Sequence, residues 1–385
     1  MLHVFVPVSA PSAATRRRRR ESPQGMEVLA ITTISAAAWL PSGWAQGVKE
    51  GWILYTNQQP STDSRLPSVG NGFVSTIVGS DDVYMAGVFN SRDSPQKSHR
   101  ARLPSAHRLA VTMDASPSVR SAWALDTRNG CWLERHDSDI ASVERRFYAH
   151  QQIRGLLVSD YTIRASTPVN LSINASQVDP ARWLQSVDFA FGSVQRISRG
   201  ASGFAACTHA AETGSPAWNA THKPAGCTNV SVVYSTPPTV AVLAAGLSRL
   251  RFVSAHASNL SDPQPWQAAL AAHASAIAAG EELYASHAAA WAALYDANTS
   301  GGSVSVHGPH GESVELTRVV AASYYALLSA ARADWPHGLS PGGLSTDGYE
   351  GHTFWDQETW MVPPLLAVGP TDLAASLLRC KPSPV

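Results

Sequence analysis

Charge and cysteine are both scarce in this chain of 385 residues. Only 15% of the residues are charged, and 29 Lys and Arg balance 29 Asp and Glu. No net field therefore attracts nucleic acid, an anionic membrane or a polyanionic substrate. Four cysteines are too few for a disulfide-built fold, and no CxxC or HExxH spacing indicates a metal. We expect a neutral partner, no nucleic acid, and no metal or other cofactor.

Apolar residues are plentiful enough for ordinary cores. They make up 44% of the chain, whose length suits about two or three domains. Twelve tryptophans are many for this length. Their indole faces suit stacking on sugars, although the same excess also fits large buried cores. The composition indicates a globular protein.

The N-terminus has the parts of a secretory signal peptide. The basic run Arg16–Arg20 precedes Met26, and an apolar run from Val28 to Leu40 is followed by small residues. This run is too short to span a bilayer comfortably, so we expect no stable membrane span. The arginine run alone would also fit a nuclear or nucleic-acid patch, but nothing basic follows it. The true start of the chain is either Met1 or Met26.

The number of N-glycosylation sequons also indicates the secretory pathway. Six of the ten asparagines open an N-x-Ser/Thr sequon, whereas about one or two would be expected at average Ser and Thr usage. We therefore expect the secretory pathway, with a secreted, vacuolar or lysosomal destination. The predicted glycosylation sites are Asn170, Asn174, Asn219, Asn229, Asn259 and Asn298.

Two of the cysteines bracket one loop. Cys207 and Cys227 enclose a segment rich in Gly, Pro and Thr that carries a sequon, and a local bridge would close it. Free buried thiols are the alternative.

The hydrophobic pattern divides the chain into four parts. Residues 1–47 form the leader and signal-like segment. Residues 48–258 contain short alternating runs between Gly, Asn and Pro, which predict an antiparallel β-sandwich. Residues 259–314 change to helical spacing and form a linker with a Gly-rich hairpin, and residues 315–385 begin a helical domain.

Several details of the helical parts follow from the same pattern. Ser261 or Asp262 is expected to cap the first linker helix, and Gly280 to interrupt the linker. Two helices and a loop cannot close a core, so residues 315–385 are expected to expose apolar side chains. These side chains are Tyr324, Leu327, Leu328, Leu365 and Leu366.

The segment 348–363, "GYEGHTFWDQETWMVP", combines aromatic and acidic side chains. A sugar ring offers apolar C–H faces that stack on indole and hydroxyls that donate to carboxylates, and Trp355 beside Asp356 supplies both partners. Glycoside hydrolysis needs two carboxylates set apart around the anomeric carbon. Asp356 and Glu358 are too close in sequence to form that pair. The alternative is a loop that caps a helix and packs.

The segment 337–370 resembles a conserved stretch of glycoside hydrolase family 65, with "FWDQETWM" at its centre. The runs "LPSVGNGFVSTIVG", "YMAGVFN", "SHRARLPS" and "SHAAAWAALYD" agree, so the resemblance covers about Trp52 to Leu378. Within the family, the eukaryotic hydrolase branch fits better than the bacterial phosphorylases. That branch includes acid trehalases and glucosidases of glucosylgalactosyl-hydroxylysine, and "HRARLP" and "GLSPGGL" look most like the latter.

The resemblance implies a mixed fold and a chemistry. The fold is an N-terminal antiparallel super-β-sandwich joined by a helical linker to an (α/α)6 barrel, of which this chain would hold an incomplete start. The activity is inverting hydrolysis of an α-glucosyl bond, with Trp355 and Asp356 binding the non-reducing glucose. In the family, the catalytic acid and base lie well downstream of this motif. They are therefore expected beyond Val385, and this chain is expected to be inactive. A non-catalytic carbohydrate-binding fragment, an acid trehalase-like hydrolase and a phosphorylase are the alternatives.

Overall fold

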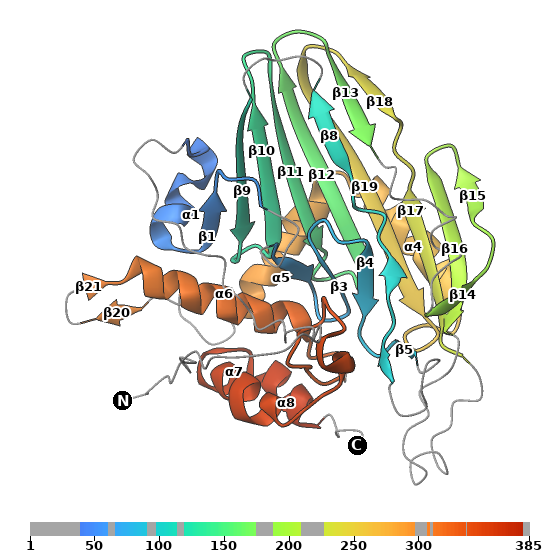
Figure 1. Ribbon diagram of the computed structural model, residues 1–385, viewed down its shortest axis with the longest axis vertical. Helices are drawn as coiled ribbons and strands as arrows, with labels where there is room; N and C mark the ends of the chain where they lie inside the picture. Colours follow the sequence, from blue (N-terminus) through green and yellow to red (C-terminus); the bar gives the residue numbers. More distant parts are fainter. Residues whose placement is uncertain are drawn as a thin grey trace, which may run out of the picture.

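Ten strands build one large antiparallel sheet, which forms the body of the molecule. The computed structural model describes residues 39–60, 66–90, 98–113, 119–174, 188–208, 227–296, 306–308, 311–335 and 337–379. The strand order is β1-β9-β10-β11-β12-β19-β17-β16-β14, with β15 beside β16 (Figure 1). The strands are β1 (Ile53–Thr56), β9 (Arg120–Asp126), β10 (Cys131–Asp137), β11 (Ala141–Ala149), β12 (Leu156–Ala165), β14 (Phe189–Phe191), β15 (Gln195–Ser198), β16 (Ala201–Thr208), β17 (Asn229–Ser235) and β19 (Gly246–Ser258).

Smaller sheets cover one face of the large sheet. Their strands are β2 (Ser68–Gly70), β3 (Val74–Ile77), β4 (Asp82–Met85) and β7 (Leu103–Pro104), then β8 (Ala110–Met113), β13 (Val169–Asn174) and β18 (Val240–Leu243), and the pair β5 (Phe89–Asn90) and β6 (His99–Arg100). Val74 and Met85 share a core with Trp132 and Phe147 of the large sheet. The predicted antiparallel β-rich body is therefore present.

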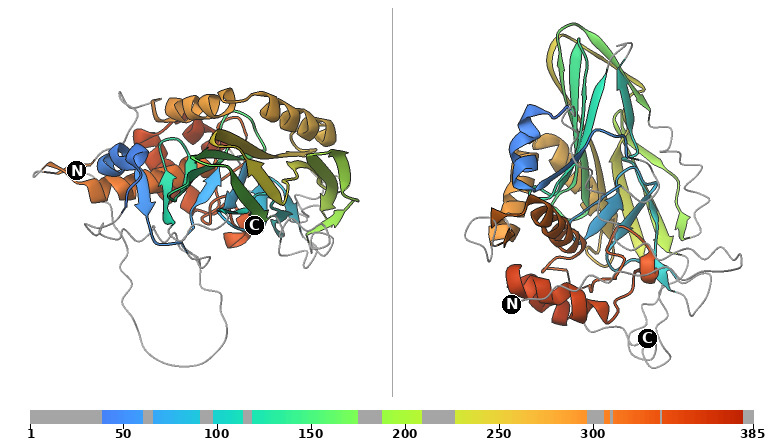
Figure 2. Two further views of the ribbon diagram at one scale, coloured as in Figure 1. Left: turned by 90° about the horizontal axis from the view of Figure 1, so that it is seen from above. Right: turned by 60° about the vertical axis from the view of Figure 1, so that its left-hand side comes forward.

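Helices cover the opposite face. The alternation of the strands sends Cys131 and Tyr148 to this side, where they meet Ala269 and Leu283. Figure 2 shows the helices α4 (Pro265–Ala278) and α5 (Glu282–Asp296) lying along the sheet. The turn η1 (Ser42–Trp44) and the helix α1 (Ala45–Glu50) join the same layer, and Trp44, which the sequence placed in the leader, is only 4% exposed.

The linker helices begin differently from the prediction. Gln264, not Ser261 or Asp262, holds the position before α4, and its side chain makes no capping bond. Pro265 starts the helix because its fixed φ suits a first turn that needs no donor. The Asp262 carboxylate instead accepts the Gln264 amide at 2.8 Å. The expected break at Gly280 is confirmed, since α4 ends at Ala278 and Gly280 has a φ of +56°.

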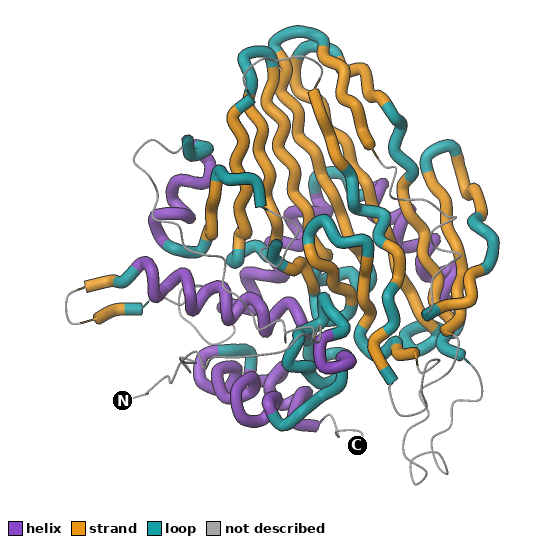
Figure 3. Tube along the Cα trace, in the orientation of Figure 1, coloured by secondary structure: helices purple, strands orange, loops and turns teal. Residues whose placement is uncertain are grey.

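The C-terminal helices lie at one end of the sandwich (Figure 3). They follow the small hairpin β20 (His307–Gly308) and β21 (Gly311–Glu312), and comprise α6 (Val314–Ala330), η2 (Gly348–Gly351), the π-helical turn η3 (Gln357–Met361), α7 (Val362–Val368) and α8 (Thr371–Arg379). The Ser313 hydroxyl caps α6 by accepting the Leu316 amide at 3.4 Å.

The expected exposure of this end is largely wrong. Tyr324, Leu328 and Leu365 are buried in the same core as the sandwich, and Leu327 packs partly against it. Only Leu366 is clearly exposed, at 52%. The sandwich supplies the missing cover, because its smaller sheets pack on α6.

The structure decides between a disulfide and free thiols for Cys207 and Cys227. Cys207 and Cys227 form a disulfide, with their Cα atoms 5.6 Å apart. Cys131 is free and buried, whereas Cys380 lies outside the described residues.

Candidate functional site

A buried arginine of the sandwich holds the loop that leads to the aromatic-acidic segment. Arg100 of β6 is 3% exposed. Its guanidinium donates to the carbonyl oxygens of Gly343 at 2.7 Å, Thr346 at 3.0 Å and Gly351 at 3.0 Å. Burial lowers the pKa of Arg100 to about 10, which leaves it charged at neutral pH. The sandwich thus fixes the path of the loop through three charge-assisted hydrogen bonds.

A histidine adds a second attachment between the same elements. The His352 ring donates from Nε2 to the Ser98 carbonyl at 2.7 Å. The same ring stacks on Phe89 of β5, with ring centres 5.1 Å apart. The short β5–β6 pair therefore holds the loop on both sides of the turn η2.

The turn η2 itself has an unusual backbone. Tyr349 and Glu350 both have positive φ angles, 56° and 57°, in the left-handed region that L-residues rarely occupy. Gly351 follows with a φ of +76°, and a Cβ there would lie 2.7 Å from the Arg100 Cβ. Backbone strain of this kind persists only where the surroundings fix it, and it gathers at functional sites.

A buried glutamine fixes the middle of the aromatic-acidic segment, where the turn η3 begins. Gln357 is fully buried. Its Oε1 accepts the Leu339 amide at 2.7 Å, and its Nε2 donates to the Leu377 carbonyl of α8 at 3.3 Å and to the Glu358 carboxylate at 2.9 Å. The π-helical turn η3 starts at this residue, and such turns occur frequently at functional sites.

Two indoles at this turn, one just before it and one within it, are exposed to solvent. Trp355 is 63% exposed and Trp360 is 60% exposed, with their rings 6.3 Å apart. Asp356 lies between them in sequence and is half-buried. Within the described part of the chain, no donor is recorded for its carboxylate. The predicted pair Trp355 and Asp356 thus offers a stacking face and an acceptor.

The other acidic side chains of the segment have different surroundings. Glu350 is exposed on the strained turn, and Glu358 is exposed beside Gln357. Asp347, just before η2, lies close enough to the sandwich to act on Asp82, whose pKa rises to about 6 mainly because of burial. The acidic character of this region therefore extends from the loop into the sandwich.

A second carboxylate of the sandwich stabilises β6 from behind. Asp188 accepts hydrogen bonds from the Arg102 side chain at 2.8 Å and from the His99 ring at 2.9 Å. Burial alone would raise the pKa of Asp188, but these donors lower it to about 2. This ionised carboxylate fixes the strand that carries Arg100.

Sequence reasoning identified Trp355 and Asp356 but missed Arg100 and Gln357. The run "SHRARLPS" was noted only as a mark of family resemblance. A buried arginine without a nearby carboxylate in sequence gives no local signal of its partner. The partner loop lies 243 residues further along the chain.

The predicted glycosylation sites that the structure describes belong to the sandwich. Four of the six asparagines belong to the described residues and are exposed: Asn170, Asn174, Asn229 and Asn259. Asn219 and Asn298 lie outside the described residues, as do Met1, Met26 and the arginine run. Glycosylation therefore stays a prediction.

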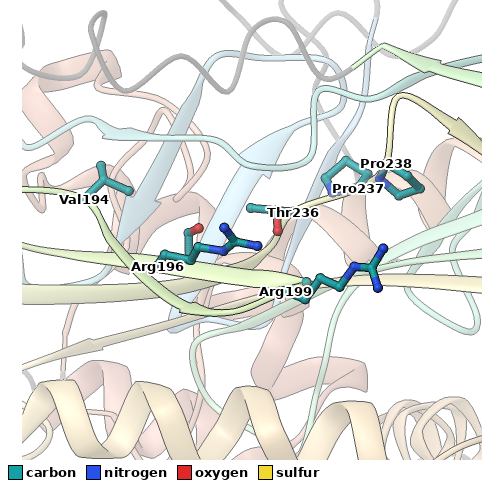
Figure 4. A pocket seen from close by; sticks show the side chains of 8 residues that line it. Val194, Arg196, Arg199, Thr236, Pro237 and Pro238 are labelled. Atoms are coloured by element: carbon teal, nitrogen blue, oxygen red, sulfur yellow. The ribbon is translucent and has the colours of Figure 1, made fainter.

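A separate shallow cleft lies at the strands β15, β16 and β17 (Figure 4). Its volume is about 740 Å³, and Arg196, Arg199, Thr236 and Pro237 are among its lining residues. None of the described residues that line it is a carboxylate, so they do not supply the acid and base that glycoside hydrolysis needs.

The described residues also bear on metal binding and membrane insertion. No group of His, Cys, Asp or Glu in them has the arrangement of a metal site. Among their helices, none is both long and apolar enough to cross a membrane.

Curated proteins that are similar to this chain over most of its length are glycosidases by name. No family model matches the chain. The protein-glucosylgalactosylhydroxylysine glucosidase of Dictyostelium discoideum is 28% identical over 362 residues, which are 88% of this chain and 46% of that protein. The protein of the same name from Gallus gallus is 27% identical over 370 residues, 89% of this chain and 47% of that protein.

A solved structure assigned as a kojibiose phosphorylase from the human microbiome shares the fold. Its TM-score is 0.61 at 13% identity, over 86% of this chain and 48% of that one. The chain spans about half the length of the curated relatives it matches. Over most of its own length it is similar to protein-glucosylgalactosylhydroxylysine glucosidases, and the resemblance to glycoside hydrolase family 65 is confirmed.

Proposed function

We propose that this chain carries the glucose-binding wall of an inverting glycosidase that acts on an α-glucosyl bond, of the glucosylgalactosyl-hydroxylysine glucosidase type. One observation carries the proposal. The exposed indole of Trp355 adjoins the half-buried Asp356, for whose carboxylate no donor is recorded in the described chain.

The two side chains would divide the work of binding. The Trp355 indole would stack on the apolar face of a glucose ring, and the ionised Asp356 carboxylate would accept two neighbouring hydroxyls. Hydrogen bonds to a charged acceptor are the stronger kind. Gln357 and Arg100 would keep this pair in place by fixing the turn and the loop before it.

We propose that the catalytic acid and base are not among these 385 residues. An inverting enzyme needs two carboxyl groups about 6.5–9.5 Å apart, on opposite sides of the bond. Glu358 is exposed and bonded to its neighbour Gln357, and Glu350 lies on a solvent-facing turn. The similarity to relatives about twice as long supports the same view.

The test combines binding with turnover. We expect the purified 385-residue chain to release no glucose from glucosylgalactosyl-hydroxylysine, kojibiose or trehalose. The same sugars should quench tryptophan fluorescence weakly and saturably. Trp355→Ala and Asp356→Asn should abolish the quenching, whereas the exposed control Glu315→Gln should retain it.

Each result has a clear meaning. Glucose release that Glu358→Gln abolishes would contradict the proposal and make Glu358 the catalytic acid. Quenching that survives both Trp355→Ala and Asp356→Asn would contradict the assignment of these two residues to sugar binding. Preference among the three sugars separates the hydroxylysine-linked substrate from the trehalase-like alternative.

A further inference from the structure

The strand β18 presents an unprotected apolar edge. It ends the sheet β18-β13-β8, and among the described strands it pairs only with β13. Val242 is 76% exposed and Val240 is 50% exposed. The strand has only four residues, which limits pairing with another chain, but it contains neither a charged residue nor a proline, two of the usual means of preventing it.

The rest of this outer face is also uncharged. The strand register places the outward side chains on one surface, because paired residues share a face. Asn170 is opposite Val242, and Ser172 is opposite Val240 on one side and Thr112 on the other. The outward side chains are Ala110, Thr112, Asn170, Ser172, Asn174, Val240 and Val242. None of these described side chains carries a charge that would oppose aggregation.

A glycan acceptor lies directly against the exposed valines. Asn170-Leu171-Ser172 is an N-x-Ser sequon, and Asn170 is exposed on β13. Directly paired residues in an antiparallel sheet have Cβ atoms about 4.5–5.5 Å apart. The first sugar on Asn170 would therefore reach Val242, and its apolar C–H face suits the valine methyl groups.

The inward side of the same strand explains why Asn170 keeps this orientation. Leu171 and Ile173 are buried in a core with Val143 and Phe252. A slip of one residue would bury Asn170 and expose these side chains, so the register is strongly specified. β13 and β18 lie side by side at one corner of the molecule, away from α7 and α8 (Figure 1).

We propose that Asn170 carries an N-linked glycan that covers Val240 and Val242 and blocks the open edge of β18. A bulky, hydrated glycan then takes the place of the missing charge or proline. The proposal needs passage of the chain through the secretory pathway, but it does not depend on the proposed glucosidase function.

The test uses the full chain secreted from a glycosylating animal-cell host. Peptide mass mapping, with an amidase that converts a glycosylated Asn to Asp, should show conversion at Asn170. Asn170→Gln and Ser172→Ala should each remove that glycan, and both should aggregate several-fold faster on warming, as followed by light scattering. Asn229→Gln, which removes an exposed sequon asparagine elsewhere, is the matched control and should not accelerate aggregation.

A double variant separates shielding from misfolding. Val242→Thr in the Asn170→Gln background should restore slow aggregation, because it removes the apolar side chain that the glycan covered. If either single variant is not secreted, enzymatic removal of the glycans from the folded chain should raise aggregation, and less so in the Val242→Thr chain. An unmodified Asn170 would overturn the assignment. Equal aggregation of the Asn170→Gln and Asn229→Gln chains would overturn the shielding role.

Discussion

Arg100 shows how much one side chain can fix at the residue scale. Its guanidinium is buried, and its hydrogen bonds to described residues all go to carbonyl oxygens of the loop 343–351. The left-handed turn at Tyr349 and Glu350 follows directly in the region that these bonds hold. We infer that Arg100 offsets the cost of that turn.

Arg100→Met should therefore destabilise the chain strongly. The substitution leaves three carbonyl groups without their donor, and each buried unsatisfied group costs about 1–3 kcal/mol. We expect a loss of at least about 3 kcal/mol in urea unfolding, with faster amide exchange across 343–351. Arg108→Met, which removes a partly exposed ion pair with Asp81, should cost less than about 1 kcal/mol. Similar losses of stability in the two variants would contradict the role of Arg100 in holding the loop 343–351.

The sequence could identify Trp355 and Asp356 because their chemistry is local. An indole next to a carboxylate is visible in two adjacent letters. Arg100 and Gln357 act through backbone atoms of distant segments, and backbone acceptors carry no residue identity in the sequence. Their roles depend on the fold that brings β6 to the loop.

At the scale of elements, the helical spacing predicted where helices lie but not which face they bury. In α4 the buried side chains are Ala269, His273 and Ala276, whereas Ile277 is 47% exposed. The sheet accepts the face with alanines because small side chains let the helix approach closely. Spacing alone would have favoured the larger Ile277.

The same limit explains the C-terminal helices. Their apolar side chains were expected to be exposed in the absence of a complete helical barrel. Most of them are instead buried in one core with the sandwich. The Tyr325 hydroxyl donates to the Ser68 carbonyl at 2.8 Å, and the Trp335 indole donates to the Ala86 carbonyl at 3.1 Å. Contacts between segments so far apart in sequence cannot be read from periodicity.

Two leucines of this region distinguish the structure from the expectation. Leu328 of α6 is completely buried, whereas Leu366 of α7 is 52% exposed. Leu328→Ala should cost about 2–5 kcal/mol in urea unfolding, because it opens a cavity in the shared core. Leu366→Ala should change stability by no more than about 0.5 kcal/mol. Equal effects would indicate that α6 does not pack on the sandwich as described.

At the scale of the whole molecule, buried histidines connect the large sheet to the helices behind it. The His287 ring of α5 donates to the Asn129 carbonyl at 2.7 Å and accepts the Gln151 amide at 3.1 Å. Burial lowers the pKa of this ring to about 3. Six more described histidines have a pKa lowered by burial. It falls to about 4 in His150 and His256, well below the usual value in His107, and below the usual value in His136, His273 and His337.

These pKa shifts set the direction in which the stability of the folded chain changes with pH. In the unfolded chain a histidine protonates near pH 6.5, whereas the buried rings stay neutral until about pH 4 or below. The unfolded state therefore binds more protons as pH falls through this window, and folding loses stability. Two buried carboxyls act in the opposite direction between about pH 6 and 3.8, because burial raises the pKa of Asp82 and Asp126 to about 6.

The histidines outnumber these carboxyls, so the chain should be most stable near neutral pH. One group contributes up to about 1.4 kcal/mol per pH unit. The four most strongly shifted histidines exceed the two carboxyls by two, which predicts a loss of about 3 kcal/mol per unit between pH 6 and 4, and the other three histidines act in the same direction. Urea unfolding from pH 8 to 4.5 measures this slope. His287→Gln keeps a donor and an acceptor but does not titrate, so it should flatten the slope by about one group. Stability that stays constant or rises down to pH 4.5 would contradict the argument.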